Sequence, residues 1–376
     1  MLESMNKKTI IIIGSSIVGL IVCLLIVVWL ISILKPHYYS YEDFEVKVTE
    51  AAKKYYKDNP TQLPASDGEY NMAYSTLVDN EYIKPLNEML KDGDSCSIQI
   101  LISKYGENYS YIPYLNCPGS YETKELYKVI IEKNPVTQCG AGLYSDNNGG
   151  YYFRGDITNN YVQLGEYGDK KKKLPYLWQI LGIENDNTIK IISTITTDDR
   201  YPWDDRYNVN ESAYEGYNDF EKSRLKDTLN DLATGNNILD EELKNKLSAT
   251  ELCIGKRKTS DTTKDGSVEC ATKTESKYLF GLMTTYEYMR ASLDANCKIS
   301  KEKSCSNYNF LAMYSNSTWS LTADVDNTNK VYTFGGGTMD VTKADRDKKL
   351  YLVARINKRA FFKSGTGTSD DPYIIR

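Results

Sequence analysis

The chain has 376 residues, with 46 basic and 51 acidic side chains and a formal net charge of -5. This balance argues against a nucleic acid partner, because proteins that bind nucleic acids usually present a strongly basic surface. The length is enough for two ordinary domains in addition to a membrane segment.

The first element is an apolar run, Thr9–Leu34, without a charged side chain; Lys7 and Lys8 precede it and Lys35 follows it. Because about 20 apolar residues cross the hydrocarbon core as a helix, the run predicts a transmembrane helix. The basic residues before the run place residues 1–8 in the cytoplasm and the rest of the chain outside. A cleaved secretory signal is the alternative, but the run is long for one and lacks a small-residue cleavage site. We therefore expect a single-pass plasma-membrane protein, anchored in the lipid bilayer.

Beyond the membrane, apolar spacing predicts a helix over residues 38–57 and a short helix over residues 73–82. Cys96 and Cys117 then enclose two apolar-rich stretches that meet at the turn Gly106-Glu107-Asn108, midway between the cysteines. Two strands folded at this turn place both cysteines opposite each other, within reach of a disulfide.

The remaining cysteines also suit disulfides, because two further pairs enclose polar loops. Zinc is disfavoured, since there is no CxxC sequence and the only histidine, His37, follows the membrane run. Disulfides agree with an oxidising exterior. Cys139 is left free or bonded to another chain. The expected disulfides are Cys96–Cys117, Cys253–Cys270 and Cys297–Cys305.

A membrane helix, an amphipathic helix, a short helix and a small disulfide-bonded sheet, in this order, resemble a pilin or pseudopilin. The segments AAKKYYKDNP, STLVDNEYIKPL and SCSIQILIS…YIPYLNC carry the resemblance, which is to pilin-like ectodomains of low-GC Gram-positive bacteria. It implies a small α+β stalk domain over residues 38–139. Unlike a prepilin, the chain has no glutamate within its apolar run.

A linker rich in glycine and asparagine is predicted at residues 140–150, ahead of a distal domain over residues 151–376. The ordered motifs FRGDITNNYVQL, LWQILGIENDNTIKIIS, SRLKDTLN, LMTTYEY, STWSL, ARI and GTGTSDDPYII resemble uncharacterised surface modules from Firmicutes. These modules are related to the formylglycine-generating-enzyme and C-type-lectin-like fold, so the resemblance implies a distal α+β module. We expect strands over residues 151–164, 177–183, 188–195, 316–321, 330–334 and 351–356 and at the C-terminus, and helices over residues 219–232, 241–249 and the second part of 281–292.

The distal part offers no catalytic motif. With one histidine, at the membrane, a Ser-His-Asp or Cys-His arrangement cannot form there, and the distal cysteines enclose polar loops as structural disulfides do. We therefore expect a non-catalytic surface protein for adhesion or for binding a glycan or protein ligand. One alternative is a minor component of a pilus or secretion filament, packed with other pilin-like subunits. A surface glycan hydrolase with paired carboxylates is a third interpretation.

The loop Thr197–Glu211 is the predicted ligand site, because long loops on a rigid scaffold often carry function. It holds Trp203 and Tyr207 together with Asp204, Asp205 and two further aspartates. The aromatic rings suit stacking on a sugar, and the carboxylates suit a supporting Ca²⁺ ion. The alternative is a solvated acidic loop, neutralised by the neighbouring arginines. If the site is correct, replacing Trp203 by alanine abolishes binding and barely changes thermal stability.

Overall fold

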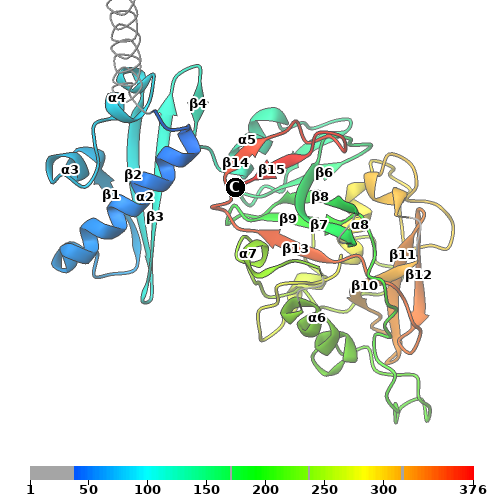
Figure 1. Cartoon of the computed structure of the whole chain (residues 1–376). Helices are drawn as coiled ribbons and strands as arrows, with labels where there is room; N and C mark the ends of the chain where they lie inside the picture. Colours follow the sequence, from blue (N-terminus) through cyan, green and yellow to red (C-terminus); the bar gives the residue numbers. More distant parts are fainter. Residues whose placement is uncertain (1–37, 170–171, 236–237, 315–316) are drawn as a thin grey trace, which may run out of the picture. The chain divides into compact units, whose positions relative to one another are not determined.

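The computed structural model describes residues 38–169, 172–235, 238–314 and 317–376. The predicted transmembrane helix over Thr9–Leu34 lies outside these residues. Within the described ranges, no helix combines the length and the apolar character that a membrane crossing requires. The chain divides into two compact units, Met1–Thr123 and Lys124–Arg376, each with its own hydrophobic core (Figure 1). Both units mix helices and strands, which confirms the α+β class.

The described part of the first unit packs one long helix against an antiparallel sheet (Figure 1). Helix α2 (Tyr41–Asp58) confirms the helix predicted over residues 38–57. It begins at Ser40, whose Oγ accepts a hydrogen bond from the backbone N–H of Asp43, as serine caps commonly do. The helix predicted over residues 73–82 is shorter than expected. The remaining elements are β1 (Gly68–Ala73), α3 (Tyr74–Asp79), α4 (Leu86–Met89), β2 (Ser97–Tyr105), β3 (Asn108–Cys117) and β4 (Tyr121–Glu122).

Strands β2 and β3 form the predicted disulfide hairpin. Tyr105 pairs with Asn108 next to the turn, and the same register continues along both strands. It brings Cys96 opposite Cys117, and their sulfurs are bonded with the Cα atoms 4.2 Å apart. The position of the turn therefore sets the pairing of the cysteines, as predicted.

The two disulfides predicted for the second unit also form. The Cα atoms are 4.4 Å apart in both Cys253–Cys270 and Cys297–Cys305. Cys139 is exposed and free in the described residues.

In the described residues, the second unit contains an eight-stranded sheet and a three-stranded sheet. The large sheet has the order β13-β9-β8-β7-β15-β14, and the β5–β6 hairpin joins it because β6 pairs with β8. Strand β15 runs parallel to β7, and the other pairs are antiparallel. The strands are β5 (Gly142–Ser145), β6 (Tyr151–Arg154), β7 (Tyr161–Asp169), β8 (Lys172–Ile183), β9 (Ile189–Ser193), β10 (Thr318–Ala323), β11 (Lys330–Gly335), β12 (Thr338–Lys343), β13 (Val353–Ile356), β14 (Phe362–Ser364) and β15 (Tyr373–Ile375).

The helices predicted for the second unit are found at the expected positions, but their lengths differ from the predicted ones. The predicted helix over residues 219–232 is a single turn followed by α6, and the one over residues 241–249 ends early, as α7. The segment 281–292 begins extended and becomes helical at Thr285, as predicted. The helices are α5 (Leu126–Lys133), α6 (Arg224–Thr234), α7 (Glu241–Lys244) and α8 (Thr285–Ala291).

The boundary between the two parts lies earlier than the sequence indicated. The first domain predicted over residues 38–139 includes the residues of α5, but Leu126, Val129 and Ile130 of this helix are buried in the core of the second unit. Residues 140–150 are not a linker, because β5 pairs with β6 there. The single strand predicted over residues 151–164 is also wrong: β6 and β7 are separate strands with different partners.

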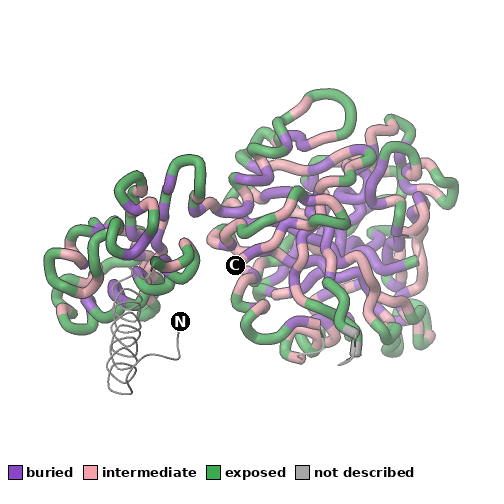
Figure 2. Tube along the Cα trace, turned by 45° about the horizontal axis from the view of Figure 1, so that its top comes forward, coloured by how far each residue is buried: buried purple, intermediate pink, exposed green. Residues whose placement is uncertain are grey.

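The core of the second unit is built from aromatic and aliphatic side chains of nearly every strand, and Figure 2 shows the buried segments running through its interior. Trp319, at the start of β10, is fully buried. The largest fully buried side chains of this unit include Trp178, Trp203, Trp319, Arg257, Tyr288, Tyr332 and Tyr373.

Candidate functional site

The predicted ligand loop points its tryptophan into the protein. Trp203 is 0% exposed, and its ring packs edge-on against Phe220 and Trp319, with centroids 6.2 Å and 6.3 Å away. A side chain in this position contacts no ligand from solvent. The prediction that Trp203 binds a ligand is therefore wrong, because tertiary packing encloses a ring that the local sequence left on a polar loop.

The predicted acidic ligands are also engaged in the structure. Asp204 is buried and accepts hydrogen bonds from Arg206 Nε at 2.7 Å and from the backbone N–H of Tyr217 at 2.8 Å. Asp205 forms an ion pair with Arg224. Tyr207 is the one predicted site residue with an exposed aromatic ring, and this ring lies edge-on to the ring of Tyr214.

Calcium receives no support from this loop. Among the described residues, the one group of acids and cysteines close enough to share an ion is Asp92, Cys96 and Cys117. The two sulfurs of that group are joined in a disulfide. It is therefore a structural cluster.

A different site lies where β6 meets β8 in the second unit. It is a pocket of about 450 Å³ whose walls come from four separate segments. These are the turn between β5 and β6, the start of β6, the end of β8 with Lys190 of β9, and α8 with the loop before it. The lining residues are Ser145, Asp146, Asn147, Asn148, Tyr151, Tyr152, Gly182, Ile183, Glu184, Lys190, Lys264, Asp265, Tyr286 and Arg290.

The turn between β5 and β6 forms one wall of this pocket. Asp146 Oδ1 accepts hydrogen bonds from the backbone N–H groups of Asn148 and Gly150, both at 2.8 Å. Asn147 and Gly149 have φ angles of 63° and 91°, a left-handed backbone that asparagine and glycine adopt at little cost. The sequence Asp-Asn-Asn-Gly-Gly therefore specifies a tight turn that presents amide side chains to the pocket.

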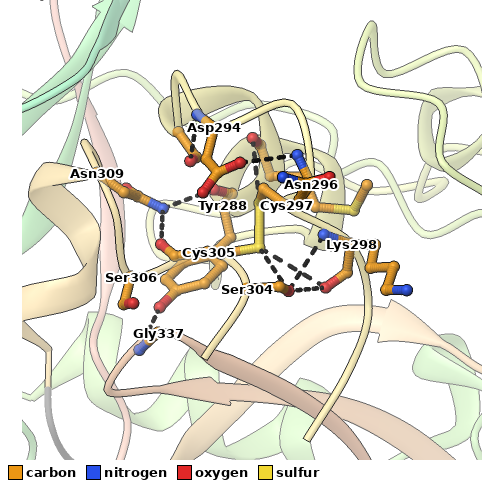
Figure 3. Close-up of a disulfide and its surroundings, with 12 residues drawn as sticks. Tyr288, Asp294, Asn296, Cys297, Lys298, Ser304, Cys305, Ser306, Asn309 and Gly337 are labelled. Carbon is orange, nitrogen blue, oxygen red and sulfur yellow. Dashed lines mark hydrogen bonds between the residues drawn. A yellow bond between two sulfur atoms is a disulfide. The ribbon is translucent and has the colours of Figure 1, made fainter. Parts of the chain in front are cut away.

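Helix α8 supplies the opposite wall and is fixed at both ends. At its start, Thr284 and Glu287 form a capping box, in which the backbone N–H of Thr284 donates to Glu287 Oε2 at 2.8 Å. Towards its end, the backbone N–H of Gly337 donates to the Tyr288 hydroxyl, and the Asn309 side-chain amide donates to the carbonyl groups of Tyr288 and Cys305 (Figure 3). The pocket side of α8 is thus held rigidly.

The Cys297–Cys305 disulfide lies behind α8 and closes the loop that follows it (Figure 3). Both cysteines are buried, at 2% and 0% exposure. Cys297 Sγ lies 3.7 Å from the carbonyl oxygen of Met289, within α8. The disulfide therefore supports the helix and takes no part in the pocket itself.

Lys190 forms the floor of the pocket and is held by a buried ion pair with Glu287, which is not among the lining residues. Lys190 and Glu287 are in direct contact, and their side chains are 9% and 2% exposed. Burial alone would raise the pKa of Glu287, but the charges of Lys190 and Arg290 hold it at about 2. Burial lowers the pKa of Lys190, and the Glu287 carboxylate opposes this effect. Because the carboxylate also accepts two hydrogen bonds from Thr284, we take the pair as ionised at neutral pH.

Aromatic rings surround the cation at the pocket wall. The Arg290 guanidinium carbon lies 4.6 Å from the centroid of the Tyr152 ring and 5.0 Å from that of Tyr286. Tyr286 packs in turn against Gly266, whose φ is +85° and where a Cβ atom would come within 2.9 Å of the ring. Glycine at position 266 therefore lets the preceding loop lie against Tyr286 and complete the wall.

Sequence reasoning missed every residue of this pocket. Two local signals were available: the turn sequence at residues 146–150, which was interpreted as a linker, and the Thr-x-x-Glu capping box at the start of α8. The spacing of Tyr286 and Arg290 also places both on one helix face. No local signal brings these segments together, because the pocket joins parts of the chain that are over 100 residues apart.

No protein-family model, curated protein or solved structure is significantly similar to this chain. The function of the pocket therefore has to be inferred from its own chemistry.

Proposed function

We propose that the chain is a membrane-anchored surface protein whose second unit binds a saccharide in the pocket between the β5–β6 turn and α8, without transforming it. The polar lining of the pocket carries this proposal. Asparagine and aspartate side chains from the turn, the buried Lys190 at the floor and tyrosine rings at the wall lie around one concave space.

This combination suits a ligand rich in hydroxyl groups. Sugar hydroxyls both donate and accept hydrogen bonds, so they match amides, carboxylates and cationic side chains together. The C–H face of a sugar ring also packs on tyrosine, and Tyr151, Tyr152 and Tyr286 all line the space. A mainly apolar ligand would leave these polar groups without partners.

The rest of the chain is consistent with surface display. The apolar run over residues 9–34 would anchor the protein in the plasma membrane, with its short N-terminal tail inside. The helix α2 and the disulfide-bonded hairpin of the first unit support the likeness to a pilin-like stalk. Likeness of the second unit to C-type-lectin-like surface modules rests on its ordered sequence motifs.

A glycan array probed with the full chain in detergent micelles tests the proposal. We expect binding to a limited set of glycans, and about tenfold weaker binding by the Tyr152→Ala variant, which removes a ring from the pocket wall. Tyr214→Ala is the matched control, because its ring is 74% exposed and outside the pocket. It should bind as the parent protein does.

Two results would count against the proposal. If no glycan binds, or if Tyr152→Ala binds as well as Tyr214→Ala, the pocket is not a saccharide site. Co-purification of the untreated protein with other pilin-like subunits, together with no glycan binding, would favour the filament-component alternative instead.

A further inference from the structure

We propose that the ligand of this pocket carries an anionic group, a carboxylate or a phosphate, that is bound between Arg290 and Lys264. The inference rests on the proposed saccharide site and adds the charge of its ligand. It follows from which charged groups of the pocket already have partners and which do not.

The acidic groups of the pocket are engaged by the protein. Glu184 lies 3.5 Å from Arg355 Nη2, and Glu287, which lies outside the lining, pairs with Lys190. Asp146 accepts two backbone hydrogen bonds within its own turn. Asp265 accepts hydrogen bonds from the backbone N–H and the hydroxyl of Ser267, at 2.9 Å and 2.6 Å. Each carboxylate is therefore stabilised without a ligand.

The two cations at the wall differ from these acids. Within the described part of the chain, neither Arg290 nor Lys264 forms an ion pair or a side-chain hydrogen bond. Both are half-buried, so water solvates them less well than on an open surface. The charges of Glu287 and Asp294 act on them without an ion-pair contact. A cation that is partly desolvated and has no carboxylate in direct contact favours a bound anion.

A third cation lies close to the same wall. Arg154 donates from Nη2 to the carbonyl oxygen of Ser292 at 2.9 Å, just beyond the end of α8. Burial lowers the pKa of Lys264, and the charge of Arg154 lowers it further, while Asp294 opposes the shift. An anion between the cations would relieve this repulsion.

Arg290 is also held in a geometry that suits anion recognition. Its guanidinium lies over the rings of Tyr152 and Tyr286, which fix the plane of the group, and among the described residues its hydrogen-bond donors have no partners. A planar, fixed guanidinium binds the two oxygens of a carboxylate or phosphate with little loss of side-chain freedom. A lysine in place of Arg290 would supply the positive charge but not the planar pair of hydrogen-bond donors.

Three hexoses that differ at one carbon test the inference. Glucose, glucuronic acid and glucose with a phosphate ester on its exocyclic hydroxymethyl group would each be titrated into the full chain in detergent micelles. Binding would be followed by calorimetry or ligand-observed NMR. We expect at least one anionic hexose to bind about tenfold or more tightly than glucose, because charge-assisted hydrogen bonds are the stronger kind. Tighter binding of glucuronic acid would indicate an acidic sugar, and tighter binding of the phosphorylated hexose a phosphate-bearing glycan.

Variants identify the groups responsible. Arg290→Gln should bring the anionic-to-neutral affinity ratio close to one, and Lys264→Gln should lower it by a smaller factor. Arg346→Gln removes an arginine whose side chain is 64% exposed, outside the pocket, and should leave the ratio unchanged. Thermal melting of each variant shows whether it is folded. Lys264 comes from a loop and Arg290 from α8, so if one variant fails to fold, the other still tests the inference.

The outcomes separate this inference from the proposed function. Equal affinity for all three hexoses, or an unchanged ratio in folded Arg290→Gln and Lys264→Gln, would overturn the anion inference and leave the saccharide site standing. No binding of any hexose, in agreement with a blank glycan array, would overturn both.

Discussion

Replacing Trp203 by alanine should destabilise the second unit strongly, which is the opposite of what the sequence alone predicts. The side chain is fully buried between Phe220 and Trp319, and its backbone carbonyl accepts a hydrogen bond from the backbone N–H of Leu225 at the start of α6. Removal of the indole would leave a cavity that links the loop, the helix and the three-stranded sheet.

The expected loss follows from the burial of the ring. Tryptophan-to-alanine changes in a packed core cost about 3–5 kcal/mol. For a unit of this size each kcal/mol lowers the melting temperature by roughly 2–4 °C, so the variant should melt roughly 6–20 °C below the parent protein.

A second variant separates volume from hydrogen bonding. Among the described residues, the indole Nε1 of Trp203 has no hydrogen-bond partner. Phenylalanine keeps much of the apolar volume and removes this unsatisfied donor, whose burial costs about 1–3 kcal/mol. Trp203→Phe should therefore lose much less stability than Trp203→Ala.

Thermal and urea unfolding of the full chain in detergent, followed by tryptophan fluorescence and circular dichroism, would measure these differences. Tyr207→Ala is the control from the same loop, because its ring is 46% exposed and should change the melting temperature little. If Trp203→Ala melted like Tyr207→Ala, the ring would not be a core residue, and the correction made to the sequence-based site would itself be wrong.

Three further predictions concern charge, cysteines and the membrane anchor. Glu287→Gln leaves Lys190 buried without its partner and should cost about 3–5 kcal/mol at neutral pH. Since the pKa of Glu287 falls from 4.5 to about 2 on folding, its stabilisation is complete above pH 4.5 and is lost as the pH falls towards 2. Acid titration of unfolding should show the difference between parent and variant shrinking over that range, and a constant difference would contradict the ion pair. Peptide mapping without reduction should recover all three disulfides with Cys139 free or joined to another chain, and a disulfide from Cys139 to Cys96 or Cys117 would refute the hairpin pairing. Mass spectrometry of the membrane fraction should find the residues before Thr9 on the intact chain, whereas a mature N-terminus after Leu34 would indicate a cleaved signal.

Local sequence determined the features that depend on neighbours along the chain. Ser40 begins α2 because its hydroxyl caps the helix, and the turn at Gly106 sets a strand register that brings Cys96 and Cys117 together. The strands predicted over residues 177–183 and 188–195 form β8 and β9, which pair as two apolar strands across a short polar turn. Capping, turn chemistry and short-loop disulfides act over a few residues, so a sequence records them directly.

Tertiary structure decided which side chains face inward. Trp203 and Asp204 stand in a polar, charged stretch, and only packing against Phe220 and Trp319 and hydrogen bonding to Tyr217 bury them. Local composition cannot report this, because burial depends on contacts with residues distant in sequence.

Local sequence also cannot report which distant residues come together in the pocket. Its turn, its floor and its helix come from residues that are unremarkable where they stand in the chain, and the pairing of β6 with β8 makes them neighbours. The sequence by itself determined the long helix α2, the β2–β3 hairpin and the three disulfides. The site was decided by tertiary packing, which brings Lys190 of β9 into contact with Glu287 of α8, the helix that also carries Arg290.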